Sequence, residues 1–189
     1  MYPSQFEYHK PSSLQEAIAL LASDPESKIL AGGHSLIPAM KLRLATPGSI
    51  VDISGIDGLK GISVNGGATI GAMTTYRELL DNADLKGPFP VIAETANVVG
   101  DPAVRNRGTL GGSMAHSDPS ADYTAVLLAL GASVTAVGGN GERTIALDDL
   151  FVDLFTTSLE ADEILTSITI PASSAGLGQA YEKHAHPAS

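Results

Sequence analysis

The spacing of apolar residues in the first part of the chain predicts short strands alternating with short helices. Ser13 and Glu16 have the spacing of a capping box at the start of a helix. The apolar residues that follow Ser13 recur at intervals typical of one helix face: Leu14, Ala17, Ile18 and Leu21. Strands are predicted at residues 6–11, 28–31 and 49–54, with a short helix through residues 40–44.

From residue 56 onward, the pattern changes to hairpins and longer helices. Asn65-Gly66-Gly67 and Asn140-Gly141 lie between β-prone runs, so each predicts a hairpin. Thr75 and Glu78 repeat the capping-box spacing before another helix. Further helices are predicted at residues 90–98 and 123–131, an irregular loop at 100–109, and strands at 163–171 and 179–185. A small α/β unit followed by a mostly antiparallel unit predicts an α+β fold rather than a doubly wound sheet.

Composition excludes several classes of function. The chain has 189 residues and a formal net charge of −10, which argues against binding to nucleic acid phosphates. It has no cysteine, so disulfides, thiolate zinc sites and iron–sulfur clusters held by this chain are excluded. The sequence has neither a signal peptide pattern nor an apolar stretch of membrane-spanning length. We therefore expect a cytoplasmic protein, with peripheral attachment at the inner face of the membrane left open, and no metal site.

Two stretches place adjacent glycines between an apolar run and small hydroxyl-bearing residues. They are residues 31–35, Ala-Gly-Gly-His-Ser, and residues 109–113, Thr-Leu-Gly-Gly-Ser. Each alone is consistent with an ordinary turn. Together they could hold a diphosphate through backbone N–H groups, which suits an acidic chain with few cations. The sequence has no Rossmann fingerprint, P-loop, nucleophile elbow or zinc-protease motif.

Three stretches resemble the FAD-binding medium subunit of molybdenum hydroxylases, the xanthine dehydrogenase family, and most of all the aerobic carbon monoxide dehydrogenase type. They are AGGHSLIPAMKLRLA, VRNRGTLGGSMAHSDPSAD and AYEKHAHPAS, which occur in the family's order. The resemblance implies a two-subdomain FAD-binding fold of the vanillyl-alcohol-oxidase or p-cresol-methylhydroxylase type. The subdomains would be residues 1–55 and 56–171. Residues 172–189 would be a linker and the start of a truncated carboxy-terminal domain, which we expect to be poorly ordered.

The same resemblance assigns residues to the cofactor. The first glycine stretch would form half of a diphosphate cradle with its neighbours: Leu30, Ala31, Gly32, Gly33, His34, Ser35 and Leu36. The second half would be Thr109, Gly111, Gly112 and Ser113. Asp122 would accept a hydrogen bond from the cofactor's hydroxyl-bearing chain, although a helix N-cap is the simpler reading of an Asp at that position. Leu165 would pack beside the flavin and Lys183 would lie near its ring, with Tyr181 as a ring-stacking or gating aromatic.

The resemblance also implies partners. A large subunit would hold the molybdenum cofactor and a small subunit two [2Fe–2S] clusters, in a dimer of heterotrimers. FAD would pass electrons from the clusters to an external acceptor, so no catalytic residue that touches substrate is expected here. Two alternatives remain: a stand-alone flavin oxidoreductase of the same fold, and a truncated, non-catalytic assembly module.

Overall fold

The computed structural model describes residues 2–184, and its first unit contains a three-stranded parallel sheet in the order β1-β3-β2. Ser13 caps α1 by accepting a hydrogen bond from the Glu16 amide, and α1 buries Ala17 and Leu21. All four residues of β3 are buried, because it is the central strand. The elements are β1 (Glu7–His9), α1 (Leu14–Ser23), β2 (Lys28–Leu30), α2 (Leu36–Lys41), β3 (Ser49–Asp52) and η1 (Ile53–Gly55).

The second unit is built on a five-stranded antiparallel sheet in the order β4-β5-β10-β6-β7. The two predicted hairpins are present, with turns at Gly66 and at Gly139-Asn140, one residue earlier than predicted for the second. A separate two-stranded hairpin, β8-β9, was not predicted. The strands are β4 (Ile62–Asn65), β5 (Gly67–Gly71), β6 (Ser133–Gly138), β7 (Gly141–Ala146), β8 (Phe151–Asp153), β9 (Thr156–Thr157) and β10 (Ile164–Ile170).

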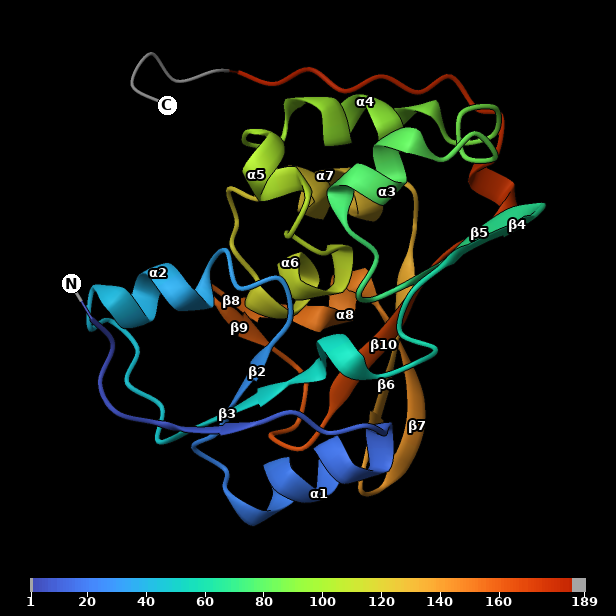
Figure 1. Ribbon diagram of the computed structural model, residues 1–189. Helices are drawn as coiled ribbons and strands as arrows, with labels where there is room; N and C mark the ends of the chain where they lie inside the picture. The colour runs from blue at the N-terminus through green and yellow to red at the C-terminus, as the bar shows by residue number, and fades with distance from the viewer. Residues whose placement is uncertain (1, 185–189) are drawn as a thin grey trace.

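Most helices of this unit gather at one end of the sheet (Figure 1), and α6 contacts both α7 and β10. Their bounds are α3 (Tyr76–Asp81), α4 (Pro90–Val98), α5 (Pro102–Arg105), α6 (Leu110–His116), α7 (Asp122–Ala129), α8 (Leu147–Leu150) and η2 (Ala172–Ser174). The largest core cluster fills the space between helices and sheet, with Phe89, Leu127 and Tyr123 almost fully buried. A smaller cluster joins the two units, because Met73 and Ile164 pack with the residues buried by α1 and β3. The arrangement is a mixture of helix and sheet, as predicted.

The short helix predicted at residues 40–44 lies earlier in the chain, because α2 ends at Lys41, and three further predictions about local structure are wrong. Residues 100–109 are not wholly irregular, because the Asp101 side chain caps the short helix α5. The second glycine stretch is not a loop: Gly111 and Gly112 lie in the first turn of α6, which Thr109 caps. Asp122 is not an N-cap, because it is the first residue of α7 and Ala121 holds the cap position.

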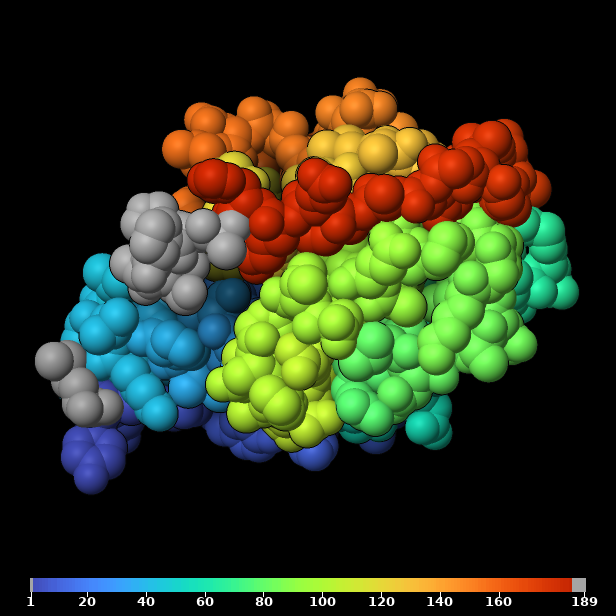
Figure 2. Space-filling model, turned by 90° about the horizontal axis from the view of Figure 1, so that it is seen from above, coloured from blue at the N-terminus to red at the C-terminus, as the bar shows by residue number. Residues whose placement is uncertain are grey.

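The carboxy-terminal segment also differs from its prediction. Residues 179–184 form no strand, because they cross the helices and no strand edge lies beside them. Residues 172–184 make specific hydrogen bonds to Pro88 and Asp122, and the expected poor order of this segment stays a prediction. Figure 2 shows this segment crossing the surface beside the helical residues. Residues 185–189, including the end of the predicted strand, lie outside the described residues.

Candidate functional site

The first glycine stretch forms the connection between β2 and α2. Gly33 has a φ of 79°, a backbone conformation that favours glycine, and its carbonyl accepts a hydrogen bond from the Ile37 amide as α2 begins. Within residues 2–184, the amides of Gly33, His34 and Ser35 donate no hydrogen bond. Ser35 occupies the N-cap position without a capping hydrogen bond from its side chain. The stretch therefore offers adjacent backbone donors, the feature that an anion requires.

The first glycine stretch packs against the backbone that leads into the second. A Cβ on Gly32 would lie 2.1 Å from the Arg107 carbonyl oxygen, a separation that atoms cannot adopt. A Cβ on Gly112 would lie 3.5 Å from the Cβ of Ala31, which is ordinary van der Waals contact. The backbone at Gly32 thus packs directly against the backbone at Arg107, and only glycine at position 32 allows this close contact.

The second glycine stretch rests on the connection between β5 and α3. The amides of Leu110 and Gly111 donate to the carbonyls of Thr74 and Ala72, at 3.0 and 2.9 Å. The Tyr76 amide donates in turn to the Gly108 carbonyl at 3.1 Å, and the amide of Gly112 donates to Oγ1 of Thr109 at 3.2 Å. These amides are already used within the protein. The free backbone donors therefore come from the first stretch, which differs from the symmetrical cradle expected.

The remaining residues of the predicted cradle border these backbones. His34 is exposed, and its Nδ1 lies 3.2 Å from the carbonyl oxygen of Gly32. Leu30 and Leu36 are half-buried, and Leu30 lies against Gly33. Ser113 lies one residue beyond the second glycine pair and is also half-buried. The structure therefore brings both stretches and their flanking residues to one place.

Asp122 and Lys183 lie together beside this region. The Lys183 ammonium is 3.0 Å from the Asp122 carboxylate, and the Tyr181 hydroxyl donates to the same carboxylate at 2.6 Å. Burial, and then the hydrogen bond to Asp122, raise the pKa of Tyr181 to about 12. Asp122, predicted to bind a cofactor hydroxyl, and Lys183, predicted to lie near the flavin ring, are thus direct neighbours.

Tyr76 lies against the backbone that leads into the second glycine stretch, and no sequence motif pointed to it as a site residue. Its ring stacks on Tyr123, with centroids 5.3 Å apart, and a Cβ on Gly108 would lie 2.7 Å from it. Burial raises the pKa of Tyr76, the Ser113 hydroxyl lowers it and the Asp122 charge raises it. The capping box before α3 was the only visible feature at this position.

Leu165 is buried in the larger core on β10, where it pairs with Ala136. The neighbouring Thr166 carbonyl accepts a hydrogen bond from the Ala72 amide, and Ala72 lies against Gly111. Leu165 thus belongs to the layer that supports the second glycine stretch.

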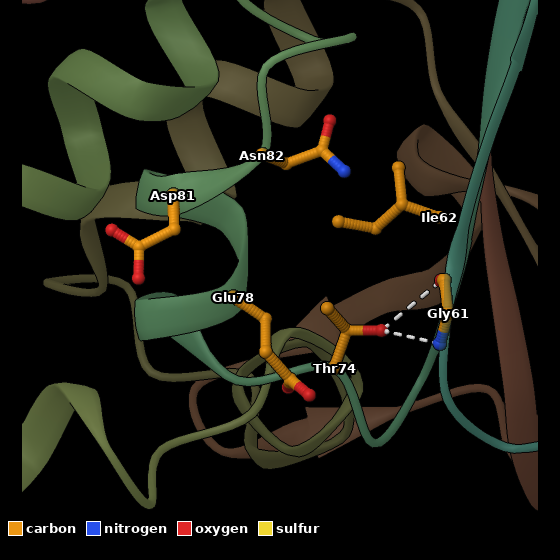
Figure 3. A pocket seen from close by; sticks show the side chains of 6 residues that line it. All are labelled: Gly61, Ile62, Thr74, Glu78, Asp81 and Asn82. Carbon is orange, nitrogen blue, oxygen red and sulfur yellow. Dashed lines mark hydrogen bonds between the residues drawn. The ribbon is translucent and has the colours of Figure 1, made fainter.

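A hollow of about 380 Å³ lies beside α3 (Figure 3). Several of its polar groups are engaged: the Thr74 hydroxyl bonds to the backbone of Gly61, and Glu78 completes the capping box with Thr75. Asp81 pairs with Arg77. The residues that line it are Gly61, Ile62, Thr74, Glu78, Asp81 and Asn82. Two of the six residues are acidic, Glu78 and Asp81, so the hollow does not suit an anion.

In the described part of the chain, no helix has both the length and the apolar character needed to cross a bilayer. Residues 2–184 likewise contain no group of three or more His, Asp or Glu side chains arranged to hold a metal ion.

The comparisons with known proteins decide the family. The family described as "FAD binding domain in molybdopterin dehydrogenase" matches residues 4–173, which include every element from β1 to β10. The chain belongs to this family. Both glycine stretches, Asp122 and Leu165 fall inside the matched region, whereas Lys183 lies beyond it.

Individual relatives agree with the family. The carbon monoxide dehydrogenase medium chain of Hydrogenophaga pseudoflava is 44% identical over 185 residues, covering 97% of this chain and 64% of that protein. The nicotine 6-hydroxylase medium subunit of Paenarthrobacter nicotinovorans is 41% identical, over 90% of this chain and 61% of that one. A solved structure of carbon monoxide dehydrogenase from H. pseudoflava matches with a TM-score of 0.88 at 43% identity, over 90% of this chain and 60% of that one. The chain therefore spans less than two thirds of these relatives.

Proposed function

We propose that this chain is the FAD-binding part of the medium subunit of a molybdenum hydroxylase of the carbon monoxide dehydrogenase type. The fold would be the two-subdomain FAD-binding architecture of the p-cresol-methylhydroxylase type, with the cofactor between residues 1–55 and 56–171. The observation that carries the proposal is the packing of the first glycine stretch against the backbone that leads into the second, beside unused amides at Gly33, His34 and Ser35. Membership of the FAD-binding family supports it.

The residues present fit a diphosphate. The amides of residues 33–35 supply donors, and the absence of a side chain at Gly32 lets the backbone before the second stretch pack directly beside them. Thr109 and Gly111 would hold the second glycine stretch in place. The first stretch would be bordered by Leu30, Ala31 and Leu36. A diphosphate bound by backbone donors needs few cations, which suits a chain with a net charge of −10.

The flavin end would lie toward Asp122, Leu165 and Lys183. FAD, when bound, accepts electrons and passes them to an external acceptor. A cation at Lys183 would favour negative charge on the reduced ring, because opposite charges attract more strongly where water is partly excluded. Lys183 is held by Asp122 and by the carbonyl of Val98, at 3.0 and 3.4 Å, so its ammonium is fixed in place.

The partners are part of the same proposal. A large subunit with the molybdenum cofactor would oxidise the substrate, and a small subunit with [2Fe–2S] clusters would deliver electrons, in a cytoplasmic dimer of heterotrimers. Relatives named for carbon monoxide and for nicotine are almost equally similar to this chain, at 44% and 41% identity. We infer that substrate choice belongs to the large subunit.

The direct test is to purify the chain alone and together with its two partner subunits, denature each sample and measure the released FAD. We expect one FAD per chain in the assembled sample. FAD in the lone chain as well would mean that the two glycine stretches suffice. No FAD in either sample would contradict the proposal and favour a non-catalytic assembly module, whereas flavin-dependent oxidation by the chain alone would favour a stand-alone oxidoreductase.

A further inference from the structure

The carbonyls at the end of α4 are bound by one arginine side chain. α4 ends at Val98, and a helix leaves its last carbonyls without partners inside the helix. Nη1 of Arg105 lies 3.1 Å from the carbonyl oxygens of both Val99 and Gly100, and 3.4 Å from that of Asn97. The Arg105 guanidinium therefore caps α4, and its positive charge faces the partial negative charge at this helix end.

The same contacts tie α5 to the end of α4 (Figure 1). Arg105 is the last residue of α5, so its side chain reaches back over the turn that joins the two helices. The turn is tight, because a Cβ on Gly100 would lie 2.9 Å from the side chain of Val104. Asp101 ends the turn by accepting a hydrogen bond from the Val104 amide at 2.9 Å. The orientation of α5 is thus set by the Arg105 side chain together with a local turn.

α5 in turn places the backbone that contacts the first glycine stretch. The amides of Arg107 and Gly108 both donate to the carbonyl of Val104, at 3.1 and 2.7 Å. The carbonyl oxygen of Arg107 then lies 2.1 Å from the position of a Cβ on Gly32. This carbonyl follows α5 by two residues, so its place opposite Gly32 depends on how α5 is held.

We propose that Arg105 is a positioning residue of the FAD site. Its guanidinium fixes α5 on the end of α4, and α5 holds the backbone at Arg107 against Gly32. This inference rests on the proposed function, because it takes the contact at Gly32 as part of the cofactor site. Arg105 then acts on the cofactor through the backbone, and a direct contact between its guanidinium and FAD is the alternative that the experiment separates.

Two variants of the full chain test the role of the guanidinium. Arg105→Met keeps an apolar side chain of similar reach and removes every N–H donor. Arg105→Lys keeps the charge without the planar set of donors. The control is Arg77→Met, which removes the same charge from an exposed arginine of α3 that pairs with Asp81. Thermal unfolding reports whether each variant is folded, and Arg105→Lys carries the test if Arg105→Met does not fold.

The first readout is amide hydrogen exchange and needs no cofactor. We expect the amides of residues 106–108 to exchange about tenfold faster in Arg105→Met, because hydrogen bonds to a charged group are lost and α5 opens more often. Arg105→Lys should lie between Arg105→Met and the wild type, and Arg77→Met should match the wild type. The amides of β6 in the same sample are the internal reference. Unchanged exchange at residues 106–108 in folded Arg105 variants would overturn the proposal.

The second readout is the affinity for FAD, measured on the same proteins. Positioning predicts about tenfold weaker binding in Arg105→Met, a smaller loss in Arg105→Lys and wild-type affinity in Arg77→Met. The loss of affinity and the faster exchange should occur in the same variants. Weaker binding with unchanged exchange would show a direct contact with FAD, and faster exchange with unchanged affinity would show a purely structural cap. Either result contradicts the proposal.

The wild-type protein keeps this inference separate from the proposed function. If the wild-type chain and its assembled complex bind no FAD, the proposed function fails, and the positioning role is rejected with it whatever the exchange rates are. If the wild type binds FAD and folded Arg105→Met binds it equally well, the positioning role alone is rejected.

Discussion

Gly32 is the residue on which the site depends most. The Arg107 carbonyl oxygen occupies the space that a side chain at position 32 would need, so even alanine would push the two segments apart. Gly111 is enclosed in the same way by Ala72, at 2.5 Å from its hypothetical Cβ. Each glycine stretch thus contains a glycine required for packing, and only the first also presents unused amides. Both stretches therefore contribute to packing, whereas only the first can contribute backbone donors to an anion.

Tyr181 gives the site a pH dependence. Its pKa is raised from 10.0 to about 12, so between these values the folded chain keeps a proton that the unfolded chain loses. The free energy of unfolding should therefore fall as the pH rises from about 10 to about 12. Urea unfolding across this range measures the loss, which should be smaller in Tyr181→Phe. Tyr76 and Tyr123 also have raised pKa values, and they remain in both proteins as the common background. An identical loss in the variant would contradict this account.

At the residue scale, the importance of the glycines could be predicted from the sequence, but the residues that contact them could not. Adjacent glycines beside Ser and Thr pointed to close backbone approach, and the structure packs the first stretch against the backbone that leads into the second. The amides of Leu110 and Gly111 donate to the carbonyls of Thr74 and Ala72. These hydrogen bonds could not be predicted, because they depend on a tertiary contact between distant segments. The assignments of individual residues to FAD remain predictions.

At the scale of elements, the capping box of α3 is the clearest local determinant. Oγ1 of Thr75 accepts from the Glu78 amide at 3.2 Å, and the Glu78 carboxylate accepts from the Thr75 amide and hydroxyl, each at 2.7 Å. Thr75→Ala should lower the free energy of unfolding by about 1 kcal/mol, measured by urea denaturation. Thr75→Ser, which keeps the hydroxyl, should behave like the wild type. Equal stability of all three proteins would show that the cap contributes nothing.

Elements with weak intrinsic propensity could not be predicted from the sequence. Two glycines favour a loop over a helix, yet α6 forms because Thr109 caps it and because Leu110 and Met114 are fully buried beneath it. The β8-β9 hairpin is likewise held by Ser117, whose hydroxyl donates to carbonyls of Asp153 and Thr156. In contrast, strongly patterned elements such as α1 and β10 could be predicted, because apolar periodicity and capping residues are local signals.

At the scale of the whole molecule, the two units share a core, and the site lies where they meet. Met73 and Ile164, from the second unit, pack with Leu21 and Val51 of the first. Gly32, from the first unit, packs on the backbone that leads into α6. A change that separates the units should therefore disturb the glycine contact and the core together. The α+β class was predictable from the order of elements, whereas this shared core was not, because no single stretch of sequence contains it.

The central claim is that the two neighbouring glycine stretches form one FAD site. Its most direct measurement is the FAD affinity of Gly32→Ala beside that of Gly48→Ala, since a Cβ at position 48 would meet nothing within 4 Å. Thermal unfolding of each variant reports whether it is folded, and Gly33→Ala, at a φ of 79°, is the second variant if Gly32→Ala does not fold. We expect about a tenfold or greater loss of affinity at position 32 and wild-type affinity at position 48. Equal affinity in folded Gly32→Ala, Gly48→Ala and wild-type chains would contradict the account.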